Sequence, residues 1–297
     1  MTPLSSSLTR LPEVRLRPLM DGYARAIAAR RMRSLLSLAI GLLCVWLAAK
    51  SAEVDLWKLF ENFHRLPSYF IRIFTLDNGR AVWTDPVEWF WGLDRWASQL
   101  GETILMAYVG TALGAIGALG LCFLAAANVS PRRWMRIAAR RFLEICRTVP
   151  ELVFALVFVI CFGLGPLAGV LAVAIHTLGA LGKQFAEVVE NGDMKPVDGV
   201  SSAGGHWMVA MRFGMLPQVL SSFVSYALLR FEINVRGATI MGFVGAGGIG
   251  QDLIEAIRKF YYTDVSAILV LVVLTVFVMD FLTERLRHRL VDVDGQR

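Results

Sequence analysis

Long apolar runs bordered by clusters of arginine are the feature that most limits how this chain can fold. The clearest run covers residues 103–127, and about 20 apolar residues suffice for an α-helix to cross the hydrocarbon core of a bilayer. Inside a bilayer every backbone N–H and C=O must be bonded within the protein, which favours helices. Further runs occupy residues 34–51, 152–162, 167–181, 218–239 and 265–281. The sequence therefore predicts an all-α, polytopic membrane protein with about six transmembrane helices.

The composition agrees with a membrane protein and argues against other classes. Hydrophobic residues make up 56% of the chain, only 18% of residues are charged, and the mean hydropathy is +0.56; soluble domains usually carry about 25% charged residues. A net charge of +6 would suggest a nucleic-acid partner for a soluble protein, but arginines beside membrane spans follow from the positive-inside rule. No CxxC spacing joins the cysteines, which we interpret as small core residues (Cys44, Cys122, Cys146 and Cys161).

The arginine clusters also predict how the chain lies across the membrane. They fall in residues 10–33, in an expected loop at residues 132–141, and in residues 285–289, and such clusters stay in the cytoplasm. We therefore expect both termini inside the cell. The apolar run near the N-terminus could be the core of a signal peptide, but its basic lead-in is long and no small-residue cleavage site follows, so we interpret it as a retained first span.

This pattern divides the chain into five predicted segments. We expect a cytoplasmic basic tail, a first transmembrane helix, an external amphipathic segment, a core transmembrane domain and a cytoplasmic tail (residues 1–33, 34–51, 52–100, 101–284 and 285–297). In the external segment aromatic residues alternate with charges, which suits helices lying at the membrane interface. That surface either helps to seat another protein or only packs at the interface.

Residues 187–217 form a polar, glycine-rich segment between two apolar runs. It is too long for a tight turn, and we expect a short helix, a break at Gly204 and Gly205, and a second short helix ending at Leu216 and Pro217. Proline suits the first turn of the next helix, where its missing N–H has no cost. A compact helical hairpin of this kind is a good docking element for a partner protein.

Charged and polar residues inside the apolar runs are candidates for a translocation pathway. Charges in a membrane span are unfavourable and usually face a bundle interior or a water-filled cavity. Glu232 and Arg236 are four residues apart and can pair on one helix face, either as part of a gate or as a structural ion pair. The other candidates in or beside the spans are Arg230, Asn234 and His176, the histidine being equally explicable as a hydrogen-bonded packing residue.

Residues 245–250 fit the pattern G-x-G-x-x-G, which also occurs in dinucleotide-binding folds. A membrane run follows instead of the strand and helix alternation that such a fold requires, so we reject a dinucleotide site. Irregular backbone at membrane depth must face protein or water. We therefore expect the glycines of this run to line the outer mouth of a pathway (Gly245, Gly247, Gly248 and Gly250).

Two stretches resemble a known family. Residues 231–250 contain FEINVR followed by a threonine and VGAGGIG, and this run resembles the phosphonate ABC transporter permeases, as do residues 147–153 and 176–183. Permeases of ABC importers also carry a loop with Glu-Ala-Ala, three residues, Gly, nine residues, Ile, one residue and Leu-Pro. Here Gly204, Leu216 and Pro217 match, Asp198 stands at the acidic position, and Gly199, Val200 and Gly214 depart from the pattern.

The resemblance implies the type I ABC importer permease fold and a set of partners. It implies two ATPase subunits, an extracytoplasmic substrate-binding protein, a second permease copy in a homodimer, and a multi-pass location in the bacterial inner membrane. The substrate implied is a phosphonate, or phosphite or a phosphate ester. No cofactor is expected in this chain, because ATP and Mg²⁺ would be bound by the ATPase. The residues implied to couple to the ATPase are Asp198, Gly204, Gly205, Leu216 and Pro217.

Other functions remain possible on the sequence alone. A methionine-type importer would share the fold, although the FEINVR run argues against it. An intramembrane enzyme acting on lipid phosphate would need a catalytic pair of His or Ser near the headgroups, and the histidines are far apart (His64, His176, His206 and His288). A secondary transporter would be expected to show an internal repeat, which we do not find. We therefore expect a transport subunit and not an enzyme.

Overall fold

The computed structural model describes residues 13–53, 56–76 and 78–294, and its regular elements are helices. Within those ranges β pairing is limited to one isolated antiparallel bridge between Thr75 and Ala81. The chain divides into two compact units, residues 1–68 and 69–297. The all-α class predicted from the sequence is confirmed.

The first unit is built around α1, a single helix spanning Glu13–Ser51. The sequence predicts a span beginning at residue 34, but the helix begins much earlier and includes most of the predicted basic tail. Within it, Arg25–Ser51 is long and apolar enough to cross a membrane, and its most apolar window is 0% buried inside the protein. Two short helices follow, α2 (Leu56–Asn62) and α3 (Arg65–Ile73), the second of which runs into the second unit.

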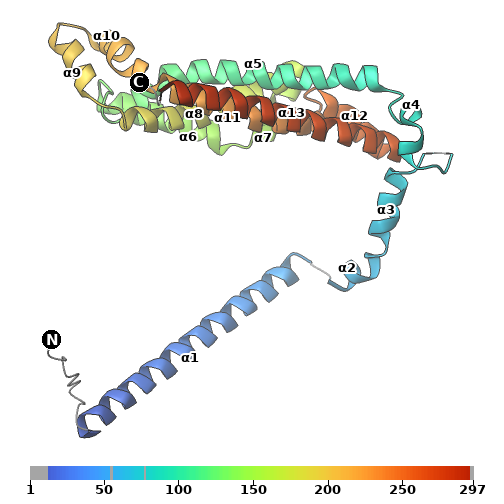
Figure 1. Cartoon of the computed structure of the whole chain (residues 1–297), viewed down its shortest axis with the longest axis horizontal. Helices are drawn as coiled ribbons and strands as arrows, with labels where there is room; N and C mark the ends of the chain where they lie inside the picture. Colours follow the sequence, from blue (N-terminus) through green and yellow to red (C-terminus); the bar gives the residue numbers. More distant parts are fainter. Residues whose placement is uncertain (1–12, 54–55, 77, 295–297) are drawn as a thin grey trace, which may run out of the picture. The chain divides into compact units, whose positions relative to one another are not determined.

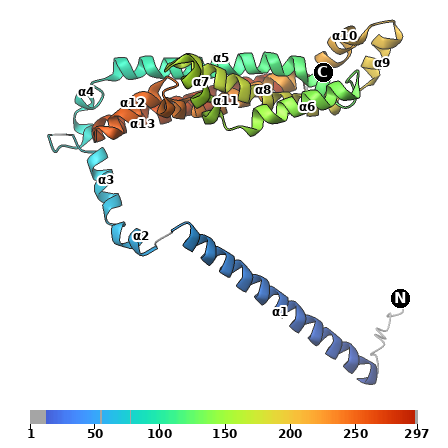
Figure 2. The ribbon, with the colours of Figure 1, turned by 180° about the vertical axis from the view of Figure 1, so that it is seen from behind.

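The second unit contains a bundle of long helices with shorter elements at both ends. Its helices are η1 (Val82–Thr84), α4 (Pro86–Trp89), α5 (Leu93–Ala125), α6 (Arg133–Thr148), α7 (Glu151–Phe162), α8 (Pro166–Glu190), α9 (Lys195–Ser202), α10 (Trp207–Ala210), η2 (Met211–Met215, a π turn), α11 (Leu216–Met241), η3 (Gly242–Val244), α12 (Ile249–Arg258) and α13 (Tyr262–Asp294). In both views, α9 and α10 project from one end of the bundle, while α4 and α12 lie at the other end (Figures 1 and 2).

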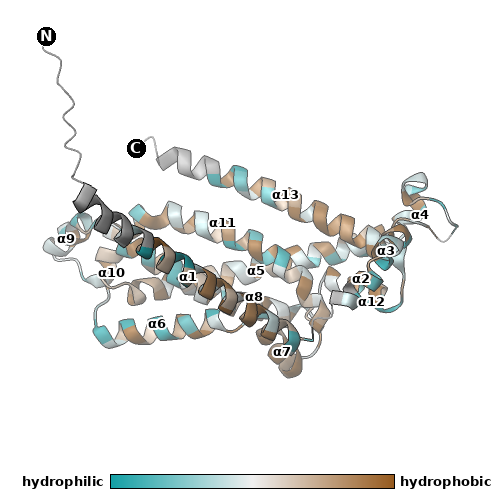
Figure 3. Ribbon diagram, turned by 90° about the horizontal axis from the view of Figure 1, so that it is seen from below, coloured by the Kyte–Doolittle hydropathy of each residue, from teal (hydrophilic) through white to brown (hydrophobic). Residues whose placement is uncertain are grey.

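The described residues contain four helices that are long and apolar enough to cross a membrane, or up to six if each of two bent pairs forms one span. This range includes the number predicted. Figure 3 shows that α13 is hydrophobic over its first part and becomes hydrophilic toward its C-terminal end. Many large apolar side chains on the helices are exposed, for example Ile116, Val273 and Phe277, as expected for surfaces that face lipid or another membrane helix.

One predicted loop is a helix. The arginine-rich residues 132–141 were expected to form a cytoplasmic loop, but they open α6, which meets α7 at an angle of 85°. Its apolar residues Ala139, Leu143 and Cys146 are buried and lie three or four residues apart, which places them on one face. The predicted third span is therefore the twelve-residue helix α7, about 18 Å long, joined to an amphipathic helix.

Small residues allow α5 and α8 to approach closely. The sequence places glycine or another small residue every fourth position along α5, which favours close helix packing in membranes. A Cβ built on Gly110 would lie 2.7 Å from Val173 Cβ, and one built on Gly114 would lie 2.7 Å from Thr177 Cβ. Both positions thus require glycine for the observed distance between the two helices.

Asn234 ties three of these helices together. Its side chain is 0% exposed, and its Nδ2 donates at 2.8 Å to Oγ1 of Thr111 on α5 and at 2.8 Å to Oγ1 of Thr177 on α8. The two donated bonds offset the cost of burying this amide, whose Oδ1 has no hydrogen-bond partner. The residue predicted to line a pathway therefore also fixes α11 against α5 and α8.

Candidate coupling and translocation sites

Gly204 ends α9 in a backbone conformation that favours glycine. Its N–H donates to Ser201 O at 3.0 Å, and the Gly205 N–H donates to Val200 O at 3.0 Å; together they form a Schellman motif. The φ of Gly204 is +88°, in the left-handed region where a side chain is strained. The predicted short helix followed by a glycine break is confirmed.

The second half of this segment differs from the prediction. The second short helix does not end at Leu216 and Pro217; instead α10 continues through the π turn into α11, whose first turn holds Pro217. Gly214 stands where permeases of the resembled family carry isoleucine. A Cβ there would lie 2.8 Å from Val197 Cα, so glycine allows α9 to pack directly on the π turn.

We refer to residues 191–215 as the helical hairpin, and its inner face is joined firmly to the bundle. Trp207 Nε1 donates to Val129 O at 2.7 Å, and Gln218 Nε2 at the start of α11 donates to Asp193 O at 3.1 Å. The apolar residues of the inner face belong to the same buried cluster as residues of α5, α6, α8 and α11 (Val197, Met211 and Met215). A displacement of the hairpin would therefore be transmitted to the helices of the bundle.

The outer face of the helical hairpin presents residues that no other part of the second unit covers. Asp198 is exposed, and next to the hairpin, at the start of α11, Pro217 is exposed and Leu216 is partly buried. Met208 is 68% exposed and Phe213 62% exposed, and the Arg212 guanidinium lies 5.5 Å from the Phe213 ring centre. In the sequence, every second residue from Trp207 to Met215 is apolar, which does not show which side is exposed. Residues four apart share a helix face, and this rule would have separated the buried Met211 and Met215 from the exposed Phe213.

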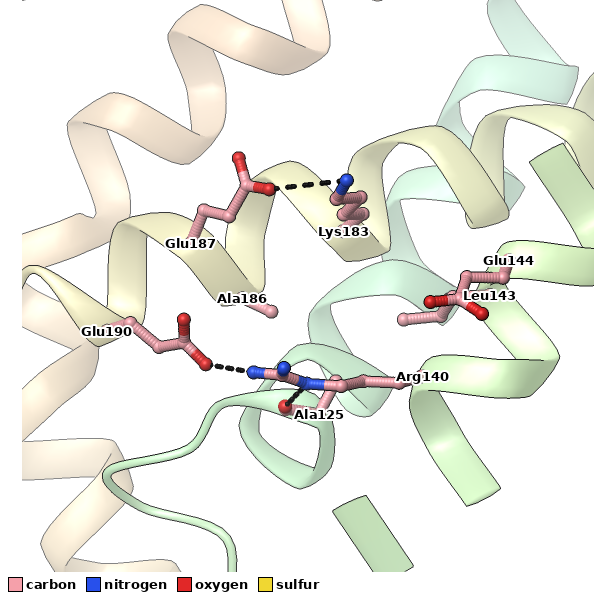
Figure 4. A pocket seen from close by; sticks show the side chains of 8 residues that line it. All are labelled: Ala125, Arg140, Leu143, Glu144, Lys183, Ala186, Glu187 and Glu190. Atoms are coloured by element: carbon pink, nitrogen blue, oxygen red, sulfur yellow. Dashed lines mark hydrogen bonds and ion pairs between the residues drawn. The ribbon is translucent and has the colours of Figure 1, made fainter. Parts of the chain in front are cut away.

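A cavity of about 230 Å³ lies at the base of the helical hairpin, between α6 and α8. In Figure 4, Arg140 points from α6 toward Glu190 at the end of α8, while Lys183 points toward Glu187 on its own helix. Arg140 Nε also donates to Ala125 O at 2.7 Å, and Glu190 accepts from the Ala127 N–H at 2.6 Å. These contacts join the middle of α6 to the ends of α5 and α8 just before the hairpin begins.

Arg236 forms the predicted ion pair with Glu232 on the same helix. It also contacts Asp280 on α13, with Nη2 at 3.1 Å from both carboxylate oxygens. The acidic partner on α13 was not anticipated, because its side chain reaches Arg236 only through tertiary packing. One cation thus joins α11 to α13 through two carboxylates, all of them partly exposed.

Arg230 belongs to a different group of charges, because it precedes Arg236 by six residues and so lies on another face of the helix. It is half-buried, and its Nε has no hydrogen-bond partner. Glu151 at the start of α7 and His176 on α8 lie within electrostatic range of it, and His176 Nδ1 is 3.1 Å from Val149 O. Packing also brings Glu151 beside α11, where a Cβ on Gly237 would overlap its carboxylate.

The glycine run is irregular, as predicted, and adopts positive φ at three positions (Gly245, Gly247 and Gly248). The Gly248 N–H donates to Glu102 Oε1 at 3.1 Å, and the Ile249 N–H donates to Thr103 Oγ1 at 3.0 Å. These N–H groups at the start of α12 would hold the phosphates of a dinucleotide, but α5 already satisfies them. The remaining glycine, Gly250, packs against the Thr239 carbonyl, where a Cβ would overlap its oxygen.

Comparison with known proteins decides the family. The sequence profile of the binding-protein-dependent transport system inner membrane component family matches residues 118–292. The chain belongs to this family. As an inner membrane permease component it is a multi-pass transport subunit of an ABC system, which also comprises an ATPase and a binding protein, and it is not itself an enzyme.

Individual relatives of this permease are named for phosphorus compounds. The phosphite transport system permease protein PtxC of Stutzerimonas stutzeri is 39% identical over 198 residues, 67% of this chain and 72% of that protein. The phosphate-import permease protein PhnE of Mycolicibacterium smegmatis is 39% identical over 191 residues, 64% of this chain and 36% of that protein.

The fold of the permease agrees with the predicted type. An inward-facing structure of the MetNI methionine ABC transporter matches 69% of this chain and 98% of its own with a TM-score of 0.57 and 20% identity. At that identity the likeness concerns the fold alone.

Among the described residues no three His, Cys, Asp or Glu side chains are grouped so that they could hold a metal ion.

Proposed function

We propose that the permease carries a small oxyanion of phosphorus, a phosphonate, phosphite or phosphate species, across the inner membrane. The names of its relatives at 39% identity support this substrate class, as does the FEINVR run. Methionine is supported only by a fold likeness at 20% identity. Because these compounds share charge and tetrahedral shape, the permease itself would distinguish them poorly. The binding protein that delivers the anion would select among them.

We propose that the ATPase docks on the helical hairpin. The observation that carries this proposal is that the inner face of the hairpin is bonded to the bundle. Exposed Met208 and Phe213 offer apolar contacts, while Gly204 and Gly205 shape the turn behind Asp198. Because the inner face is bonded to the segment that follows α5 and to α11, closure of two ATPase subunits on ATP and Mg²⁺ would move the bundle helices. The nucleotide and the metal are held by the ATPase, so this chain needs no cofactor.

The pathway follows from the charges on α11. Arg230, half-buried near His176, offers a positive group to a passing anion, and its unpaired Nε is consistent with that use. Arg236, held between Glu232 and Asp280, would act as part of a gate between α11 and α13. Asn234 would keep the wall of the pathway in place through its bonds to α5 and α8.

Two copies of the permease would enclose the pathway. We infer a homodimer, with the N- and C-termini and the helical hairpins in the cytoplasm and the glycine run 245–250 at the outer mouth. The arginine-rich segments support this orientation, since the start of α6 and the end of α13 lie at the hairpin end of the bundle (Figure 1). The two hairpins would then face two ATPase subunits.

ATP hydrolysis in proteoliposomes tests this function. The permease would be assembled with its ATPase and binding protein, with 2-aminoethylphosphonate, phosphite or phosphate as the ligand. We expect one of these anions to stimulate hydrolysis and to accumulate inside the vesicles. An assembled complex that responds to none of them but responds to methionine would contradict the proposed substrate class, whereas failure to bind any ATPase would contradict the coupling role.

A further inference from the structure

The turn between α12 and α13 carries an aromatic residue in a conformation that usually selects glycine. The Phe260 N–H donates to Ile257 O at 3.2 Å, and the Tyr261 N–H donates to Ala256 O at 3.0 Å, which together make a Schellman motif. Phe260 has φ +59°, in the left-handed region that is unfavourable for a bulky side chain. It occupies the same position of the motif that Gly204 occupies after α9.

Folding does not explain why phenylalanine stands there. The side chain is 71% exposed, so little apolar surface is buried in return for the unfavourable backbone. Its ring centre lies 6.4 Å from that of Tyr262, and the adjacent Tyr261 is 54% exposed. Unfavourable backbone conformations that packing does not explain often occur at functional sites, which makes Phe260 a candidate contact residue.

Phe260 lines a cavity of about 590 Å³. The walls come from α3, from the segment around α4 and from the start of α13, and they include Arg72, Glu88 and Asp264. Trp91 Nε1 donates to Asp264 Oδ1 at 2.9 Å, and the Arg72 guanidinium lies 5.8 Å from the Tyr262 ring centre. These contacts fix the walls in advance, so a partner would find the surface already ordered.

The chemistry of the cavity suits a protein partner better than lipid. Exposed aromatic side chains beside charges of both signs are typical of the energetic centre of protein interfaces. The neighbouring groove between α3 and α13 shows the contrast, because it is lined almost wholly by apolar side chains such as Phe70, Val273 and Phe277. That groove, and not the cavity of Phe260, has the character of a lipid-facing surface.

α4 and the start of α13, which contribute to the lining of the cavity, lie at the end of the bundle opposite the helical hairpin (Figure 1). We propose that Phe260 and this cavity are the docking surface for the extracytoplasmic binding protein, with Phe260 as an anchor residue. The proposal rests on the proposed function, since the hairpin must face the cytoplasmic ATPase for this end to face outward. A binding-protein-dependent system needs such an outward contact, and this cavity supplies both shape and polarity for it.

Replacing Phe260 by glycine separates the ring from the fold. Glycine suits the Schellman position, so Phe260→Gly should fold at least as well as the wild type. In nanodiscs holding the permease and its ATPase, we expect hydrolysis without the binding protein to be unchanged. The concentration of phosphite-loaded binding protein that gives half-maximal stimulation should rise at least tenfold, as for loss of a central interface residue.

Two further variants complete the test. Phe260→Asn, which also tolerates the left-handed region, should behave like Phe260→Gly, whereas Ile116→Ala removes an equally exposed side chain (71%) from the middle of α5 and should change nothing. An unchanged half-maximal concentration in both Phe260 variants would overturn the proposal. If less complex also reached the membrane in these variants, Phe260 would be a lipid contact instead. Absence of stimulation in the wild type would instead contradict the proposed function itself.

Discussion

Gly204 offers the sharpest test of the helical hairpin at the level of a single residue. Because its φ is +88°, we expect Gly204→Val to destabilise the hairpin by about 2 kcal/mol and to lower stimulated ATP hydrolysis. Gly199, in the middle of α9, has open space around its Cβ position. Gly199→Ala should therefore be neutral or stabilising by up to about 1 kcal/mol, and thermal unfolding of both variants would show the difference. Equal effects would argue against the left-handed turn.

Arg236 tests the gate at the same scale. Arg236→Met leaves Glu232 and Asp280 without their shared cation and loosens the link between α11 and α13. Since the three groups are partly exposed, we expect a shift of only about 0.5–1 kcal/mol, seen as a roughly twofold to fivefold rise in hydrolysis without binding protein. Arg236→Lys should restore most of the control. If hydrolysis without binding protein and transport were both unchanged in Arg236→Met, the ion pairs of Arg236 would have only a structural role and no role in a gate.

These residues also show where inference from sequence ends. The pairing of Arg236 with Glu232 follows from a spacing of four on one helix, and the turn at Gly204 follows from local preference. The contacts to Asp280 on α13 and of Glu151 beside α11 depend on how helices far apart in the chain pack together. Nothing in the local pattern around Phe260 distinguishes it from an ordinary interfacial aromatic residue.

At the scale of the helix, the contact between α5 and α8 depends on glycine at the interface. A Cβ on Gly114 would meet Thr177 Cβ at 2.7 Å and Ala174 O at 2.8 Å, whereas one on Gly120 would meet nothing within 4 Å. We expect Gly114→Ala to cost about 1–3 kcal/mol by overpacking and to lower the unfolding temperature in detergent. Gly120→Ala on the same helix should not lower it. A similar loss in both would argue against overpacking at Gly114 as the cause, because the change from glycine to alanine raises helix propensity at either position.

The helices themselves were predicted with unequal success, for a physical reason. Continuous apolar runs mark spans directly, so α8, α11 and α13 contain the predicted segments, and α5 contains all but the last two residues of its own. The run of arginines masked α6, because its amphipathic pattern combines buried Leu143 and Cys146 with a charged face. Composition alone suggested a loop there. The arginines before residue 34 likewise concealed that α1 begins at Glu13 and so extends ahead of the predicted first span.

At the scale of the whole molecule, orientation connects the proposals. If the helical hairpin docks the ATPase, Asp198 must lie in the cytoplasm and Val87 on α4 must lie outside. Both residues are exposed, so a cysteine at either site should be accessible. The exposed native cysteines, Cys44 and Cys161, would first be replaced by serine. This background leaves only the buried Cys122 and Cys146.

A thiol reagent that cannot cross membranes then reads the orientation. In spheroplasts we expect Val87→Cys to be labelled to near completion and Asp198→Cys to be labelled only after the membrane is opened. This follows because the arginine-rich start of α6 and the end of α13 stay in the cytoplasm and lie at the hairpin end of the bundle. The opposite pattern would place the hairpin outside, out of reach of a cytoplasmic ATPase. In that case neither coupling through the hairpin nor docking of the binding protein at Phe260 could hold.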